Sequence, residues 1–286
     1  MTEELRTVDA ALLSHLQTWQ GRAETLRDTI TSAPVSGLSA TLDREDPAPV
    51  PGTALPPLWH WLYFLPQVRQ SGLGPDGHPA RGGFLPPVPL PRRMWAGGRL
   101  RWEEHNPLLV GDAVQRTSRI ESVTHKAGRT GDLVFVLVKH EISNARGLAL
   151  TEEHDIVYRA APQPGDPVPV PTAAETGAPW HRSITPDDVL LFRYSALTFN
   201  GHRIHYGRRY VTEVEGYPGL VVHGPLIALM VLDAMPRQAI SRFSFRALKP
   251  AVAGETVIAE GRLTDDGADL WARCGDATLM RARVAF

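Results

Sequence analysis

The side chains best suited to proton transfer in this sequence are histidines and an asparagine gathered in two short stretches. Asn200, His202 and His205 stand in FRYSALTFNGHRIHY, and His223 with Gly224 follows eighteen residues after the last of them. An imidazole exchanges a proton near neutral pH, and an asparagine amide can orient a water molecule by hydrogen bonding. This combination of residue types predicts an enzyme that uses acid–base chemistry.

The second stretch, VVHGPLIALMVLDAM, contains the predicted start of a buried helix over residues 226–235. Pro225 suits the first helical position because its missing N–H would be unpaired there. The free N–H groups near Gly224 can stabilise negative charge, and a glycine lets a ligand approach the backbone closely. We therefore expect an oxyanion site at Gly224, with His223 holding the loop through a hydrogen bond.

Several further segments must position these groups. Apolar spacing predicts a helix over 7–19, a weaker one over 25–42, and a buried helix or helix start in LWHWLYFLPQV, residues 58–68. Residues 189–197 are predicted to form a short helix or strand leading into the histidine loop. β-Branched, partly alternating runs predict strands over 94–159 and 243–286. The Gly- and Pro-rich loop 71–93 is long, and long loops inside compact domains are usually functional.

The chain also repeats its own plan. The segment NPLLVGDAV, residues 106–114, matches KPAVAGETV, residues 249–257, at an offset of 143, which is half of the 286 residues. This repeat favours a duplicated unit. The Pro-rich linker divides the chain into a first half over 1–160, a linker over 161–179 and a catalytic half over 180–286.

Composition excludes several classes of function. The net charge of −1 and pI near 6.8 give no sign of a nucleic-acid or anionic-membrane partner. Cys274 is the only cysteine, so a disulfide framework and a cysteine-based zinc site are excluded. Without a signal peptide or an apolar run long enough to span a membrane, a cytoplasmic protein is expected. No metal is expected, because five first-half histidines lack ligand spacing: His60, His105, His125, His140 and His154.

A buried helix followed by antiparallel strands that wrap it is an α+β arrangement. The helix and the Gly-[Asp/Glu] turn resemble the hotdog fold. Two copies would make a double hotdog, in which two antiparallel sheets each wrap a central helix and the chain is pseudo-dimeric.

The histidine stretches resemble the MaoC-like hotdog hydratases, which carry D-x-N-P-x-H before the central helix and H-G at its start. His223 and Gly224 match the second element. Without gaps, the motif His falls on His205 and the motif Asp on Asn200. The motif Asn and Pro fall on His202 and Arg203, so the motif carboxylate is missing.

YSALTFNGHRIHY is more similar to the hydroxyacyl-thioester dehydratase type 2 branch, as are WQGR at 19–22, LWHWLYFLP at 58–66 and GHPARGGFLPPVPLPRRMWAGG at 77–98. The resemblance implies water addition to, or removal from, an acyl-CoA or acyl-carrier thioester. A short branched or dicarboxylic acyl group of the mesaconyl type is expected. It implies no separate cofactor, because CoA belongs to the substrate. It also implies a first half without a catalytic loop and a homodimer of double hotdogs.

Each residue has a proposed role in this chemistry. His205 is the expected base, and the alternative is a loop histidine whose hydrogen bonds are satisfied. Asn200 is expected to orient the water, and the alternative is a residue that caps the loop. Three roles stay open for His202: it is the base in place of His205, it contacts the substrate, or it faces solvent. The residues expected to line the substrate are Tyr194, Thr198, Tyr206, Arg203 and Arg246. For the tyrosines, packing is the simpler interpretation, and for the arginines it is a solvated surface.

Two other functions remain open. Thioesterases also use hotdog folds, and fold alone does not define function. They generally present a carboxylate near the helix, whereas no acidic residue lies between Val189 and Thr212. The second alternative is a non-catalytic module that binds acyl thioesters, which the missing motif Asp leaves possible.

Overall fold

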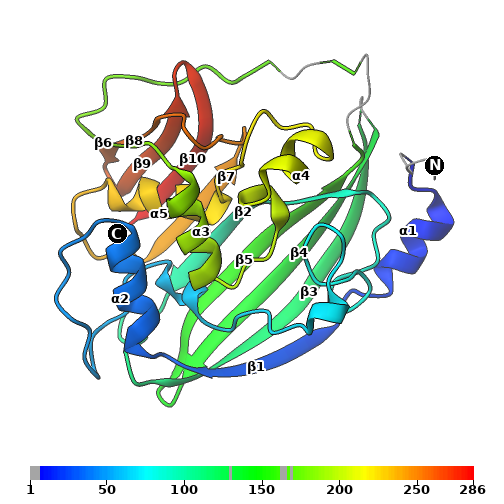
Figure 1. The fold of residues 1–286 in the computed structure, drawn as a ribbon. Coiled ribbons are helices and arrows are strands. Elements are labelled where there is room, and N and C mark those ends of the chain that lie inside the picture. Colours follow the sequence, from blue (N-terminus) through cyan, green and yellow to red (C-terminus); the bar gives the residue numbers. More distant parts are fainter. Residues whose placement is uncertain (1–6, 129–130, 162–165, 168–169) are drawn as a thin grey trace.

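The structure is a computed structural model that describes residues 7–128, 131–161, 166–167 and 170–286. Its centre is one antiparallel sheet of ten strands in the order β1-β3-β4-β5-β2-β7-β10-β9-β8-β6 (Figure 1). The first five strands are β1 (Ala23–Thr29), β2 (Arg92–Trp102), β3 (Ala113–Gly128), β4 (Gly131–Asn144) and β5 (Gly147–Arg159). The other five are β6 (Trp180–Ile184), β7 (Arg242–Ala247), β8 (Val257–Thr264), β9 (Gly267–Cys274) and β10 (Ala277–Ala285).

The two halves of the sheet have the same strand order read from edge to centre. In the first half the order is β1-β3-β4-β5-β2, and in the second it is β6-β8-β9-β10-β7. The halves join where β2 pairs with β7, from Gly97 opposite Arg246 to Arg101 opposite Arg242. This arrangement is the expected double hotdog, except that the two expected sheets join edge to edge through β2 and β7 into one continuous sheet.

The repeated sequence segments occupy equivalent places, between β2 and β3 and between β7 and β8. Gly111 and Gly254 have φ angles of 97° and 89°, in the left-handed region that favours glycine. The repeat therefore preserves a turn. The boundaries at 160 and 179 stay a prediction, and residues 162–165 and 168–169 of the linker lie outside the described residues.

The helices lie against the inner face of the sheet or at its rim (Figure 1). The α-helices are α1 (Ala10–Gln17), α2 (Ser32–Thr41), α3 (Asp188–Leu197), α4 (Arg208–Glu213) and α5 (Gly224–Asp233). Three single turns of 3-10 helix are η1 (Trp59–Leu62), η2 (Gln70–Gly72) and η3 (Arg203–His205). No helix among the described residues is long and apolar enough to cross a membrane.

Two of the predicted helices differ from the structure. The segment 25–42 divides into β1 and α2, and Pro34 is tolerated because it lies in the first turn of α2, where N–H groups are unpaired. The segment 58–68 forms only η1. It is flanked by Leu58 and Phe64, whose φ angles of 70° and 57° cannot continue a right-handed helix.

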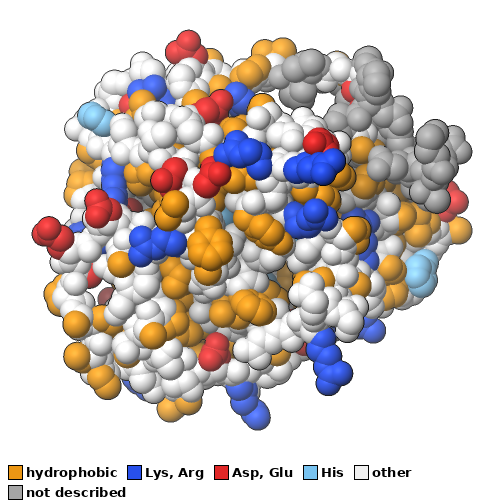
Figure 2. All heavy atoms as spheres, in the orientation of Figure 1, with side chains coloured by type: hydrophobic (Ala, Val, Ile, Leu, Met, Phe, Trp, Pro, Cys, Tyr) orange, Lys and Arg blue, Asp and Glu red, His pale blue; other side chains and the backbone are white. Residues whose placement is uncertain are grey.

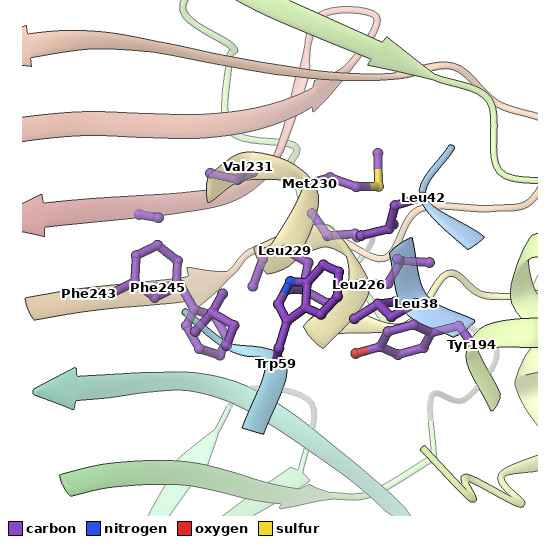
Figure 3. Packing of buried hydrophobic residues seen from close by; sticks show 14 of the residues in the cluster. Leu38, Leu42, Trp59, Tyr194, Leu226, Leu229, Met230, Val231, Phe243 and Phe245 are labelled. Carbon is purple, nitrogen blue, oxygen red and sulfur yellow. The ribbon is translucent and has the colours of Figure 1, made fainter. Parts of the chain in front are cut away.

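The main core surrounds α5, the most apolar helix. Leu226, Leu229 and Met230 are buried in one cluster with Trp59 of the first half and Phe243 of β7, and Leu226 and Leu229 are drawn beside Trp59 (Figure 3). Because both halves contribute to this one core, α5 is fixed relative to the first-half loops as well as to its own strands.

Ionic contacts also tie the halves at the end of α5. Asp233 binds Arg44 of the first half and Arg182 of β6. At the centre of the sheet, a Cβ on Gly98 would lie only 2.9 Å from the Phe245 ring, so the β2–β7 junction requires a residue without a side chain.

Candidate active site

His205 is the last residue of η3, and α4 separates it in the chain from the loop that leads to α5. The ring is 7% exposed, and its Nδ1 lies 2.7 Å from the carbonyl oxygen of Val221. Because a carbonyl can only accept, Nδ1 carries the proton and Nε2 keeps its lone pair. His205 is therefore held in the tautomer that a base requires.

His223 lies between His205 and the start of α5. The two rings stack with centroids 3.7 Å apart, and Nε2 of His223 lies 2.8 Å from Oγ of Ser195. This contact agrees with the loop-fixing role expected for His223. Its Nδ1 is buried without a partner among the described residues.

Gly224 is the first residue of α5, and Pro225 follows as the second. Its amide finds no backbone acceptor among the described residues. A Cβ at this position would meet only the Trp95 carbonyl oxygen, at 4.0 Å, so there is room beside this residue. Trp95 belongs to β2, which places this free amide at the junction of the two halves.

Asn200 holds the turn that presents the histidines. Its side-chain Oδ1 accepts a hydrogen bond of 3.0 Å from the backbone N–H of His202. Its backbone N–H donates to the Ser195 carbonyl at 2.8 Å. The side-chain oxygen is thus occupied, and the NH₂ group is the part that remains for a water. The water-orienting role stays a prediction.

His202 contacts two other imidazoles. Its ring centroid lies 5.4 Å from that of His205 and 4.0 Å from that of His78, which belongs to the first-half loop 71–93. His78 in turn lies 3.0 Å from the carboxylate of Asp76. Asp76 therefore supplies a carboxylate near these histidines, although no acidic residue lies between 189 and 212.

Sequence reasoning missed Asp76 and His78, because their loop is far from the histidine stretch in the chain. The length of loop 71–93 and the segment 77–98, which contains His78, are the available signals, but no spacing links Asp76 or His78 to the histidine stretch. Donor atoms of Asp76, His78 and His202 all lie within 4.8 Å of one another, a spacing that would also admit a cation.

All three histidines of the second-half loop favour the neutral form. Burial lowers the pKa of His205 to about 4, although its bond to Val221 opposes the shift. Burial and the neighbouring His78 and His205 lower the pKa of His202 to about 2. Burial also holds the pKa of His223 well below its usual value. Near pH 7 these imidazoles are neutral and can accept a proton.

The expected substrate-lining residues have different surroundings. Tyr194 is 2% exposed, and its hydroxyl points into the core near Leu226 without a partner among the described residues (Figure 3). Thr198 donates to the Tyr194 carbonyl at 2.7 Å, which ends α3. Tyr206 is 49% exposed and donates to the Gly201 carbonyl at 2.8 Å. Of these three, Tyr194 has the closest contact with the imidazoles, with its ring 4.9 Å from His223.

The two arginines in that set lie apart. Arg203 stacks over the Tyr210 ring at 4.1 Å beside the histidine loop. Arg246 is exposed on β7, whose buried side chains Phe243 and Phe245 face the core, so Arg246 points to the opposite face of the sheet. There it lines a groove of about 950 Å³, and the structure does not bring it to the histidines.

Solved structures share this fold at low sequence identity. HtdX of Mycobacterium tuberculosis superposes with a TM-score of 0.65 at 21% identity, over 92% of this chain and 99% of that one. A second M. tuberculosis protein, described as a double hotdog, superposes with a TM-score of 0.58 at 14% identity, over 93% and 95% of the two chains. They define the class as double-hotdog proteins.

Sequence comparison specifies the family and its chemistry. Residues 58–253 match the hydroxyacyl-thioester dehydratase type 2 family, and the chain belongs to it. The chain is also 47% identical over 275 residues to the mesaconyl-C(4)-CoA hydratase of Chloroflexus aurantiacus, a match that covers 93% of this chain and 96% of that protein. The chain is thus a lyase that adds water to, or removes it from, acyl thioesters, as the histidine stretches predicted.

Proposed function

We propose that the chain hydrates a short, branched, unsaturated CoA thioester with a second, free carboxylate, as in a mesaconyl group. The support for this acyl group is the 47% identity with the C. aurantiacus mesaconyl-C(4)-CoA hydratase over almost the whole of both chains. Two features of the structure also support it. The imidazoles of His205 and His223 are buried and stacked, and Gly224 at the start of α5 has room beside it at the junction of the halves.

The proposed chemistry needs two groups. Nε2 of His205 takes a proton from a water molecule while the water oxygen bonds to the β-carbon of the substrate. The π electrons then move onto the thioester oxygen, which lies at the Gly224 amide. Return of the proton from His205 to the α-carbon completes the addition of water. Positioned proton transfer of this kind supplies roughly 100- to 10,000-fold in rate.

One observation carries the proposal: the Nδ1–H of His205 is bound to the Val221 carbonyl at 2.7 Å beside a free helix start. This bond leaves the basic nitrogen of His205 available. The stacked His223 ring, 3.7 Å away, closes the other side of the imidazole. The water would then bind at Nε2 of His205 and the thioester oxygen at the Gly224 amide, two groups held by η3 and α5.

We propose that the phosphates of CoA bind near α4. Basic side chains gather over this region of the surface (Figure 2). However, Arg208 pairs with Asp188 at 2.8 Å and Arg209 pairs with Glu213 at 2.8 Å, so each would have to leave an exposed ion pair to bind phosphate. Exposed pairs of this kind contribute only about 0–1 kcal/mol, so the exchange costs little.

The test is a substrate comparison with the purified chain. Mesaconyl-C4-CoA and crotonyl-CoA are followed for loss of enoyl absorbance, and free thiol release is measured in parallel. We expect hydration, with mesaconyl-C4-CoA preferred in kcat/KM and no thiol released. Thiol release without hydration would instead indicate a thioesterase. Light scattering on the same sample tests the proposed homodimer.

A further inference from the structure

Loop 71–93 of the first half is fixed to the histidine loop of the second half. The Arg203 amide donates to the Asp76 carbonyl at 2.9 Å, and Nη1 of Arg203 donates to the Pro75 carbonyl at 3.0 Å. Gly77 and Gly201 face each other so closely that a Cβ on Gly77 would lie 1.9 Å from the Gly201 oxygen. The two loops therefore form one unit, although well over a hundred residues separate them in the chain.

This contact brings a carboxylate to the imidazoles. Oδ1 of Asp76 accepts from the His78 amide at 3.0 Å, and Oδ2 lies 3.0 Å from Nδ1 of His78. Nδ1 of His78 therefore carries a proton. The His78 ring lies 4.0 Å from that of His202, and the nearest donor atoms of Asp76 and His202 are within 4.8 Å.

The Asp76 carboxylate is charged in this setting. Burial would raise its pKa, but the hydrogen bonds from His78 and the nearby His202 outweigh burial and hold the pKa of Asp76 well below its usual range. Asp76 and His78 are about three-quarters buried, with side-chain exposures of 27% and 23%. A fixed negative charge thus lies beside the row His78–His202–His205.

We infer that Asp76 is the positioning carboxylate of this active site and that it replaces the acid missing from the histidine loop. It acts through His78 and His202, so the first half contributes to the chemistry and is more than a partner surface. This inference rests on the proposed hydration at His205. It assigns Asp76 and His78 a role in orienting His202, and through it His205, as a proton passes from water to His205 and on to the α-carbon.

The test compares variants of nearly equal shape. Asp76→Asn removes the charge, and His78→Gln removes the imidazole. Asp46→Asn is the control, because Asp46 is also a partly buried carboxylate of a first-half loop but binds Arg44 and Ser39. We expect Asp76→Asn and His78→Gln each to lower kcat about tenfold to a hundredfold, with KM nearly unchanged and the control near wild type.

Two readouts separate this role from a structural one. If Asp76 and His78 act as one unit, the kcat of the double variant equals that of the single variant with the lower kcat. Proton transfer also becomes more rate-limiting, so the solvent deuterium isotope effect on kcat increases. A partly unfolded sample would lower kcat without changing the isotope effect. Wild-type kcat and isotope effect in Asp76→Asn, or additive losses in the double variant, would overturn the inference.

A second pair of variants tests the loop contact itself. Gly77→Ala places a methyl group against Gly201, whereas Gly52→Ala has the same backbone strain, with φ of 90° against 87°, but no atom within 4 Å. We expect activity to fall in Gly77→Ala and to remain in Gly52→Ala. Equal activity in both would contradict the inference. So would loss of wild-type activity on treatment with EDTA and its return with Zn²⁺, because Asp76, His78 and His202 would then be metal ligands.

A wild-type chain that hydrates no enoyl-CoA would refute the proposed function, whereas active wild type with an unaffected Asp76→Asn refutes only this inference. The two failures are therefore distinguishable in one set of assays.

Discussion

Gly224→Val tests the oxyanion site with little disturbance of the fold. The φ angle of Gly224 is outside the left-handed region, and a Cβ would have only the Trp95 carbonyl oxygen near it, at 4.0 Å. A branched side chain directly before Pro225 is disfavoured in the helical region, which opposes the substitution by roughly 1 kcal/mol. The free energy of unfolding should therefore fall by no more than about 1–2 kcal/mol, which leaves the protein folded.

Activity should respond very differently. The branched side chain would occupy the open space through which a thioester oxygen reaches the Gly224 amide. Loss of one such donor typically costs about 3 kcal/mol in barrier, which corresponds to roughly a hundredfold in kcat. Steric exclusion of the substrate adds to this loss, so we expect at least a hundredfold fall in kcat/KM.

The assay is loss of enoyl absorbance, with thermal unfolding measured on the same preparation. Gly83→Val is the control, because Gly83 also has no positive φ and a Cβ placed there would meet no atom within 4 Å. Gly83 belongs to loop 71–93, but it is exposed and its carbonyl accepts hydrogen bonds from Trp19 and Arg22. A folded Gly224→Val protein with normal hydration would refute the reasoning. The start of α5 would then be an ordinary helix end.

The remaining predictions concern pH and the division into halves. Since the pKa of His205 is lowered to about 4, kcat/KM should stay flat from neutral pH and fall only near pH 4; an acid limb near pH 6.5 would contradict this. The free energy of unfolding should also decrease as the pH is lowered from about 6.5 to about 4, because in this range His205 takes up a proton in the unfolded state but not in the folded state. The expected slope is at most about 1.4 kcal/mol per pH unit for this group, measured by denaturant unfolding at several pH values. A fragment of residues 180–286 should be insoluble or inactive because β7 loses its pairing with β2, and a soluble, active monomer would contradict this.

Local pattern was sufficient for much of the fold. The apolar run after Pro225 predicted the buried helix, and the repeated turn at Gly111 and Gly254 predicted the duplication. Both signals depend on residues that are close together in the chain. The segment 58–68 did not follow this rule. Its apolar side chains from Leu58 to Phe64 are mostly buried as predicted, but the left-handed φ angles of Leu58 before the helix and Phe64 after it limit the helix to one turn.

The site was less accessible to sequence reasoning. His205, His223 and Gly224 lie near one another in the chain, and the structure brings them together as their spacing suggested. Asp76 and His78 could not be found this way, because only tertiary contacts between two loops bring them to His202. Arg246 shows the opposite error. Side chains alternate between the two faces of β7, and Phe243 and Phe245 face the core. Arg246 therefore points to the opposite face of the sheet and does not reach the imidazoles.

Turnover of His205→Ala is the most direct test of the central claim that this imidazole is the base in thioester hydration. With mesaconyl-C4-CoA and crotonyl-CoA as substrates, we expect kcat to fall by about a hundredfold or more while KM changes little. His202→Ala, measured beside it, should retain more activity than His205→Ala. Near-normal kcat in His205→Ala would contradict the claim, and near-normal kcat in both variants would exclude the histidine loop as the source of the proton transfer.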